Sequence, residues 1–75
     1  MNAPATISVD ASETLDARWI QLAVGMRDIA EEMIERAALL PRSDPRRHVG
    51  FKVGHEMRVC AADMDQAREE AASAA

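Results

Sequence analysis

The stretch LLPRSDPRR, residues 39–47, decides how this chain folds. Proline has no backbone N–H and a fixed φ, so a helix that runs into Pro41 must end just before it. Ser43 or Asp44 can cap a following helix, and Pro45 suits the first turn of that helix. The stretch therefore predicts two helices joined by a short turn, which favours antiparallel packing of one helix on the other.

Before the turn, large apolar residues recur at steps of four and three, the spacing of a coiled-coil seam. The members of this row are Leu15, Trp19, Leu22, Met26, Ile29, Met33 and Leu40. Asp10 with Glu13 forms a capping box that can start the helix. We therefore expect a helix over about residues 11–40, preceded by a flexible tail over residues 1–9 that lacks a helical period.

After the turn, a second row repeats the same spacing, and it predicts a helix over about residues 45–72. Its members are Val49, Val53, Met57, Cys60, Met64, Ala67 and Ala71. Gly50 and Gly54 weaken the start of this helix but let another backbone approach closely. The expected fold is all-α: an antiparallel two-helix hairpin over residues 10–75, with a turn at 41–44 and the two heptad rows meeting in one seam.

The first helix carries a second stripe of apolar and small residues beside the seam. It consists of Ile20, Ala23, Ala30, Ile34 and Ala37, with Arg27 in the middle. One partner helix cannot cover both stripes. We therefore expect another helical protein to cover the second one, most simply a second copy in a homodimer that forms a four-helix bundle. The residues expected to make this intermolecular contact are Trp19, Ile20, Met26, Arg27 and Ile34, and Trp19 leads because aromatic side chains concentrate binding energy.

The composition excludes several classes of protein. A chain of 75 residues buries a marginal core, and a single cysteine allows no disulfide within the chain, which leaves oligomerisation as the means of stabilisation. The net charge of −4 and the presence of only two aromatic residues argue against a general nucleic-acid surface. No apolar stretch is long enough to span a membrane. A lone thiol without a secretory signal predicts a cytoplasmic protein, and the excess of arginine over lysine is typical of GC-rich bacterial genomes.

The segment GHEMRVCAADM, residues 54–64, places His55, Glu56 and Cys60 close together in sequence. The helical period directs Cys60 into the seam, as a small buried side chain, and His55 to the opposite side. Because a zinc site needs about four converging ligands, we expect no metal and no cofactor here. A two-helix hairpin also lacks the concave site that catalysis requires, so we expect no catalytic residues and no enzyme.

Positive charge gathers around the turn. Residues 42–58 hold five basic and two acidic side chains, a net charge of +3. The candidates for contact with an anionic partner are Arg42, Arg46, Arg47 and Lys52. The favoured interpretation is a non-enzymatic helix-binding protein, such as a small adaptor, chaperone or regulator, that acts through helical packing and self-association. The alternatives are a nucleic-acid-associated regulator that uses the basic turn at residues 42–52, and an enzyme with an anion-binding site between subunits, at Arg27.

Overall fold

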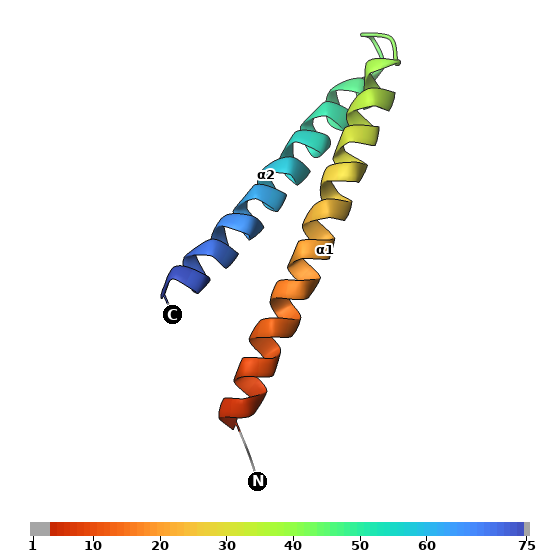
Figure 1. Ribbon diagram of the computed structural model, residues 1–75. Coiled ribbons are helices and arrows are strands. Elements are labelled where there is room, and N and C mark those ends of the chain that lie inside the picture. Colours follow the sequence, from red (N-terminus) through yellow and green to blue (C-terminus); the bar gives the residue numbers. More distant parts are fainter. Residues whose placement is uncertain (1–3, 75) are drawn as a thin grey trace.

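The structure is a computed structural model that describes the backbone of residues 4–74 and the side chains of residues 11–74. Two helices make up this part of the chain, α1 over Pro4–Ala38 and α2 over Pro45–Ala74, and it contains no strand. The helices lie side by side in opposite directions and diverge toward the termini (Figure 1). The all-helical class and the packing of one helix on the other are therefore confirmed.

The first helix begins earlier than the sequence analysis predicted. α1 starts at Pro4, whereas the predicted range was 11–40 and residues 1–9 were expected to form a flexible tail. Proline is tolerated in the first turn of a helix, because the N–H groups there have no partner within the helix. Residues 5–9 contain neither proline nor glycine, so nothing in them interrupts the helix. The part of the expected tail at residues 1–3 lies outside the described residues.

Asp44 caps the second helix. Its Oδ1 atom accepts a hydrogen bond of 2.9 Å from the backbone N–H of Arg46, which is the pattern of an N-cap residue. The Arg46 guanidinium also reaches back to the same carboxylate, with Nη2 at 2.6 Å from Oδ2. These hydrogen bonds from Arg46 lower the pKa of Asp44 to about 2. The unfavourable charge of Arg46 near the positive end of α2 is thus compensated locally.

Arg47 ties the start of α2 to the end of α1. Its Nη1 atom donates to the carbonyl oxygens of Ala38, at 3.0 Å, and of Leu40, at 2.8 Å. The last carbonyls of a helix have no partner within the helix and carry its negative dipole end, so a cation is favoured there. The guanidinium carbon also lies 5.2 Å from the centroid of the Phe51 ring, within the range of a cation–π interaction. Arg47 therefore stabilises the C-terminal end of α1.

The contact between the helices is made by small residues. The buried side chains are alanines, with Ala30 and Ala61 both 0% exposed. We use the name small-residue contact for Ala23, Ala30 and Ala37 of α1 with Gly50, Gly54 and Ala61 of α2. A Cβ atom added to Gly50 would lie 2.7 Å from the Cβ atom of Ala37. The predicted close approach of another backbone at the glycines is thus observed within the chain itself, because interaxial distance follows the size of the side chains between two helices.

This contact reverses the predicted roles of the two stripes of α1. The second stripe, expected to await a partner molecule, faces α2 through Ala23, Ala30 and Ala37. Leu22 and Ile29, expected in the seam of the hairpin, are 53% and 52% exposed. From the sequence, either stripe of α1 could face α2, because both repeat every seven residues. The second stripe faces α2 with Ala37 against Gly50 and with Ile34 against Gly54.

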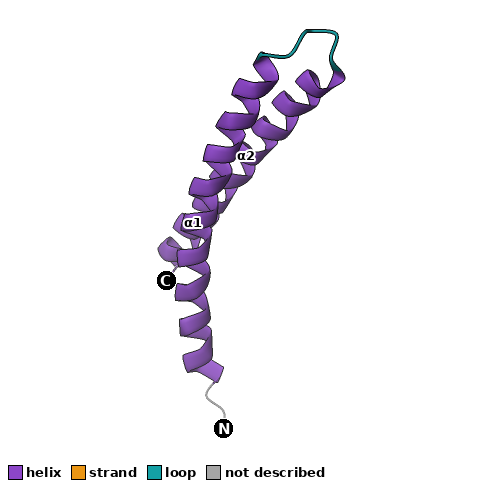
Figure 2. Cartoon of the chain, turned by 90° about the vertical axis from the view of Figure 1, so that its right-hand side faces the viewer, coloured by secondary structure: helices purple, strands orange, loops and turns teal. Residues whose placement is uncertain are grey.

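The hairpin forms a single layer of helices. Its extents are 60 × 24 × 15 Å, and the side view shows the two helices apart near the turn and overlapping farther from it (Figure 2). Its radius of gyration is 17.5 Å, against about 11 Å for a compact chain of this length. Among the described side chains, no large one is fully buried. A stable domain normally buries apolar faces between two layers, and here the second layer is missing.

Candidate functional site

The heptad rows that were predicted to form the seam between the helices lie together on one side of the hairpin instead. In α1, Leu22 and Ile29 each precede an alanine of the small-residue contact by one residue. In α2, Val53 and Cys60 stand in the same relation to Gly54 and Ala61. One residue is a rotation of about 100° around a helix axis. Because two antiparallel helices are related by a two-fold axis perpendicular to their common plane, equivalent positions on the two helices point to the same side.

We call this side the apolar flank. It consists of Leu15, Trp19, Leu22, Met26, Ile29 and Met33 of α1 with Val49, Val53, Met57, Cys60 and Met64 of α2. Several of its members are about half exposed, among them Leu15, Leu22, Ile29 and Val49. Scattered exposed apolar residues are ordinary on protein surfaces, but a contiguous patch along a whole molecule marks an interaction site.

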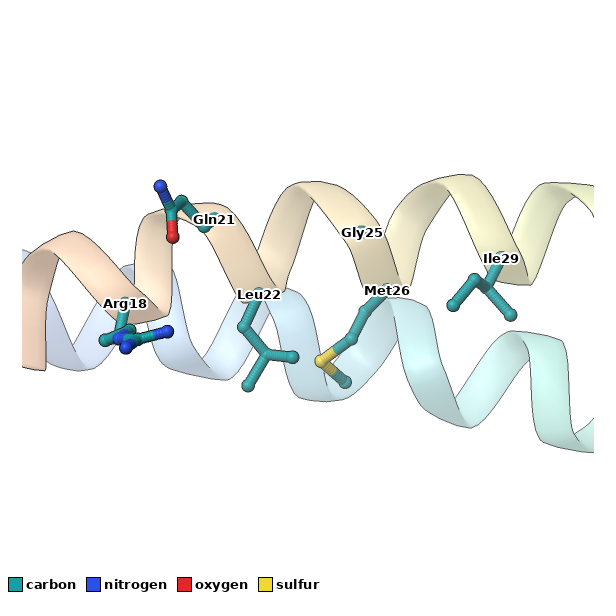
Figure 3. Close-up of a pocket in the computed structure, with 6 residues that line it drawn as sticks. All are labelled: Arg18, Gln21, Leu22, Gly25, Met26 and Ile29. Carbon is teal, nitrogen blue, oxygen red and sulfur yellow. The ribbon is translucent and has the colours of Figure 1, made fainter.

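The middle of the flank on α1 is hollowed. A shallow depression of about 420 Å³ is lined by Arg18, Gln21, Leu22, Gly25, Met26 and Ile29. Figure 3 shows Leu22, Met26 and Ile29 projecting from the same side of α1, while Gln21 points away from them. Gly25 leaves space beside these side chains, since nothing lies within 4 Å of the position that its Cβ would take. The depression can receive a large apolar side chain of another helix in the way a knob enters a hole.

Two more depressions connect the flank across both helices. One lies near the turn and is lined by Met33 of α1 with Pro45, Arg46, Val49 and Gly50 of α2. The other lies at the open end and brings Leu15 and Trp19 of α1 beside Ala67 and Ala71 of α2. Trp19 therefore lies beside these two alanines. The flank thus runs from the turn to the open end over both helices.

The five predicted interface residues separate into two groups. Trp19 and Met26 belong to the apolar flank, where both are partly exposed. Ile20, Arg27 and Ile34 do not. Ile20 is 47% exposed on the other side of the small-residue contact.

Arg27 and Ile34 make contacts within the chain, which corrects their placement on an uncovered stripe. Arg27 Nη2 lies 2.7 Å from Asp65 Oδ2 of α2, and Arg68 Nη2 lies 2.9 Å from Asp65 Oδ1. Hydrogen bonds from Arg68 and then Arg27 lower the pKa of Asp65. Ile34 is half-buried, and its Cγ1 atom would be 2.7 Å from a Cβ atom added to Gly54. The sequence missed Asp65 as the partner of Arg27 because nothing local joins two residues on different helices.

The basic turn is partly occupied by contacts within the chain. Arg46 binds the Asp44 carboxylate, and Arg47 binds the carbonyls at the end of α1. Arg42 and Lys52 are exposed, and within the described part of the chain neither forms an ion pair. Arg42, Arg47, His48 and Phe51 line a depression of about 350 Å³ beside the turn. The signal for the role of Arg47 was present in the sequence, since an arginine at a helix N-terminus suits the C-terminus of the helix just before it.

The chemistry-bearing residues of the second helix stay apart. His55 is exposed, and Cys60, expected to be a small buried side chain, is also exposed because it lies on the apolar flank. Across residues 4–74, no three histidine, cysteine or acidic side chains come close enough together to hold a metal ion. Neither α1 nor α2 has an apolar stretch long enough to cross a bilayer.

Comparison of the chain with protein-family models, with curated proteins and with solved structures found no match.

Proposed function

We propose that this chain is a non-enzymatic helix-binding protein, a small adaptor, chaperone or regulator, that works by packing its apolar flank against other helices. Its first partner is a second copy of itself, and the two hairpins together form a four-helix bundle. The observation that carries this proposal is the apolar flank, a row in which Leu, Ile and Val side chains about half exposed alternate with partly buried Met side chains from both helices. Amphipathic helices recognise each other through such rows.

The exposed area of the hairpin supports the proposal. The chain exposes 5804 Å², whereas a compact monomer of the same mass exposes about 4,500 Å². The excess of about 1,300 Å² is more than the roughly 800 Å² that each partner buries in a standard protein–protein interface. A helix packed along the flank would supply the missing second layer and give the large side chains a core.

Mass measurement by light scattering tests the proposal. The wild-type chain should have the mass of two chains, and Leu22→Glu with Ile29→Glu should reduce it to one, because two carboxylates cannot be buried in an apolar interface without a partner. Val24→Glu is the matched control, since Val24 is 54% exposed and Leu22 53%, but Val24 lies off the flank. Ile34→Glu would be a poor test, because Ile34 belongs to the contact within the chain.

Two outcomes would overturn the proposal. One is a wild-type chain that remains a stably folded monomer at high concentration. The other is a control variant, Val24→Glu, that dissociates the oligomer as completely as the two substitutions on the flank. Far-UV circular dichroism of every variant shows whether the helices persist.

The basic turn and Arg27 support the two alternatives less well. A nucleic-acid-associated regulator would need basic side chains directed at phosphates, and Arg46 and Arg47 are engaged within the chain. An electrophoretic shift that falls steeply with salt would favour that alternative. An enzyme with an anion site between subunits would need the guanidinium of Arg27, which pairs with Asp65 instead.

A further inference from the structure

We infer that the second copy docks head to tail, with α2 against the partner's α2 and the two turns at opposite ends of the bundle. This inference rests on the proposed function and names the arrangement in which the apolar flank is used. Two hairpins that share such a flank can pair in two ways that keep two-fold symmetry. Either the turns lie at the same end, with α1 facing the partner's α2, or they lie at opposite ends, with each helix facing its own counterpart.

The charge on α2 favours the head-to-tail arrangement. Residues 44–59 hold four basic and two acidic side chains, a net charge of +2, with Arg46 paired to Asp44. Residues 60–74 hold one basic and four acidic side chains, a net charge of −3. In the head-to-tail arrangement, each positive half of α2 runs along the negative half of the partner's α2. Complementary charge along the edges of an interface selects the orientation of a partner even where it adds little affinity.

Head to tail, the two α1 helices face each other, each with a net charge of −3 over residues 11–38. The competing arrangement instead sets the positive half of α2 along residues 29–38 of the partner's α1, with a net charge of −2, but it pairs like charges at the open end. There the negative half of α2 would lie along residues 11–28 of the partner's α1, which hold three acidic and two basic side chains. The two basic turns would also meet at one end. Such like-charge neighbours cost free energy, and the cost grows as the ionic strength falls.

The shape of the hairpin gives an independent reason. Gly50 and Gly54 let α2 approach α1 closely in the half of the hairpin nearer the turn, and the helices diverge toward the termini (Figure 1). With both turns at one end, the bundle would be narrow there and open at the other end, where Ala67 and Ala71 are too small to fill it. Head to tail, the narrow end of each hairpin covers the wide end of the other. The cross-section is then even, as close packing requires.

The distance between the two Cys60 thiols distinguishes the two arrangements. It is the fourth of the seven residues in the row from Val49 to Ala71. It is also exposed on the flank. When α2 meets the partner's α2 in opposite directions, the middles of the two rows meet, so the two Cys60 thiols become neighbours. With the turns together, Cys60 faces the partner's α1 and the thiols are separated by the diagonal of the bundle, too far for a disulfide, which needs Cα atoms within about 7 Å.

Mild oxidation with diamide tests the inference on the full chain. The wild type should convert mainly to a disulfide-linked dimer. The matched control is Val59→Cys in a Cys60→Ser background, which moves the thiol one residue along the helix and off the flank to an exposed position. That control should give at least a tenfold slower conversion. Equal conversion of the two variants would overturn the inference.

A distance measurement gives the orientation without relying on Cys60. Arg42→Cys in the Cys60→Ser background carries a spin label at the turn. Head to tail, two labels lie about 45 Å apart, the length of a 30-residue helix. With the turns together they lie within about 25 Å, since neighbouring helices are about 10 Å apart. A short distance in a stable dimer would overturn the head-to-tail inference and leave the proposed function standing, whereas a monomer under all conditions would overturn both.

Discussion

Gly50 of α2 lies so close to Ala37 of α1 that a Cβ atom at position 50 would meet the Ala37 Cβ atom at 2.7 Å. Non-bonded carbon atoms prefer separations of about 3.5–4.0 Å, and the Cβ atom of alanine is fixed to its backbone. No rotation of a side chain can relieve this overlap. The glycine is therefore required by the distance between the helices, and that distance in turn directs the large apolar residues out to the flank.

Replacement of this glycine should destabilise the hairpin. Gly50→Ala forces the helices apart, at a cost of about 1–3 kcal/mol in the free energy of unfolding. The gain in helix propensity, about 1 kcal/mol, offsets only part of this cost. Gly25→Ala is the control for helix propensity, because nothing within the hairpin lies within 4 Å of a Cβ atom there, and below the dissociation constant of the dimer it should stabilise α1 by about 0.5–1 kcal/mol. Urea unfolding at one fixed protein concentration measures both.

A second substitution at Ala37 should offset the loss of stability caused by Gly50→Ala. Ala37→Gly removes the atom that a new Cβ at position 50 would meet, so the double variant should be more stable than the sum of the two single effects predicts. Simple additivity of the two substitutions would show that the two positions do not touch.

A second prediction concerns the link between the helix ends. Arg47→Met keeps an unbranched apolar stem but removes the donors to the carbonyl oxygens of Ala38 and Leu40. We expect a loss of about 1 kcal/mol in the free energy of unfolding, because those carbonyls lose a charged donor. Arg42→Met at the exposed turn is the control and should change stability by less than about 0.5 kcal/mol. An equal effect of the two substitutions in thermal melting would contradict the capping role of Arg47.

The turn and the class of fold could be predicted because they depend on local chemistry. Pro41 ends a helix wherever it occurs, and Asp44 followed by Pro45 starts one, without help from the rest of the chain. The start of α1 was predicted less well. The Asp10–Glu13 pattern can cap a helix, but α1 runs through it from Pro4, since a capping box permits a helix to begin without requiring it.

The choice of contact face could not be made from the sequence alone. Both stripes of α1 have heptad spacing, and a hydrophobicity argument favours the one with larger side chains. The structure uses the alanine stripe, because Gly50 and Gly54 permit an approach that Leu22 and Ile29 would prevent. α1 does have more apolar surface than α2 covers, but most of the uncovered residues belong to the other stripe, and of the second stripe Ile20 stays exposed.

Acid should weaken the hairpin through its two paired carboxylates. Hydrogen bonds from Arg46 lower the pKa of Asp44 from 3.8 to about 2, and those from Arg68 and Arg27 lower the pKa of Asp65. A carboxylate with a lower pKa in the folded state stabilises that state fully above its unfolded pKa, about 4, and loses this contribution as the pH falls toward 2. The thermal midpoint of the wild type should therefore fall over this range.

Substitution of one carboxylate shows how much of the acid sensitivity that residue causes. Asp65→Asn should lower the midpoint at pH 7 and flatten its dependence on pH below about 4. Asp63→Asn is the control, since Asp63 lies two residues away and forms no ion pair with any described residue. If the thermal midpoint depends on pH identically in the Asp65→Asn variant and the wild type, Asp65 does not contribute to the acid sensitivity.

The last prediction uses the native thiol as a measure of how well the apolar flank is covered. Cys60 is exposed in the single hairpin and lies in the middle of the α2 row. If helices of a second copy cover the flank, the thiol is shielded from a bulky aromatic reagent, whereas the small oxidant diamide can still reach it when the interface opens briefly. Reaction with an aromatic disulfide reagent should then be slow at high protein concentration and accelerate at least tenfold on dilution below the dissociation constant.

Leu22→Glu with Ile29→Glu should give the fast rate at every concentration, because this variant cannot bury the flank. Val24→Glu should keep the slow rate and its dependence on concentration. A wild-type rate that is fast and independent of concentration would mean that the flank stays open to solvent in solution. The large apolar side chains of α1 would then stabilise no assembly. A dimer that buries a different surface gives another result: Cys60 reacts quickly while light scattering still reports two chains.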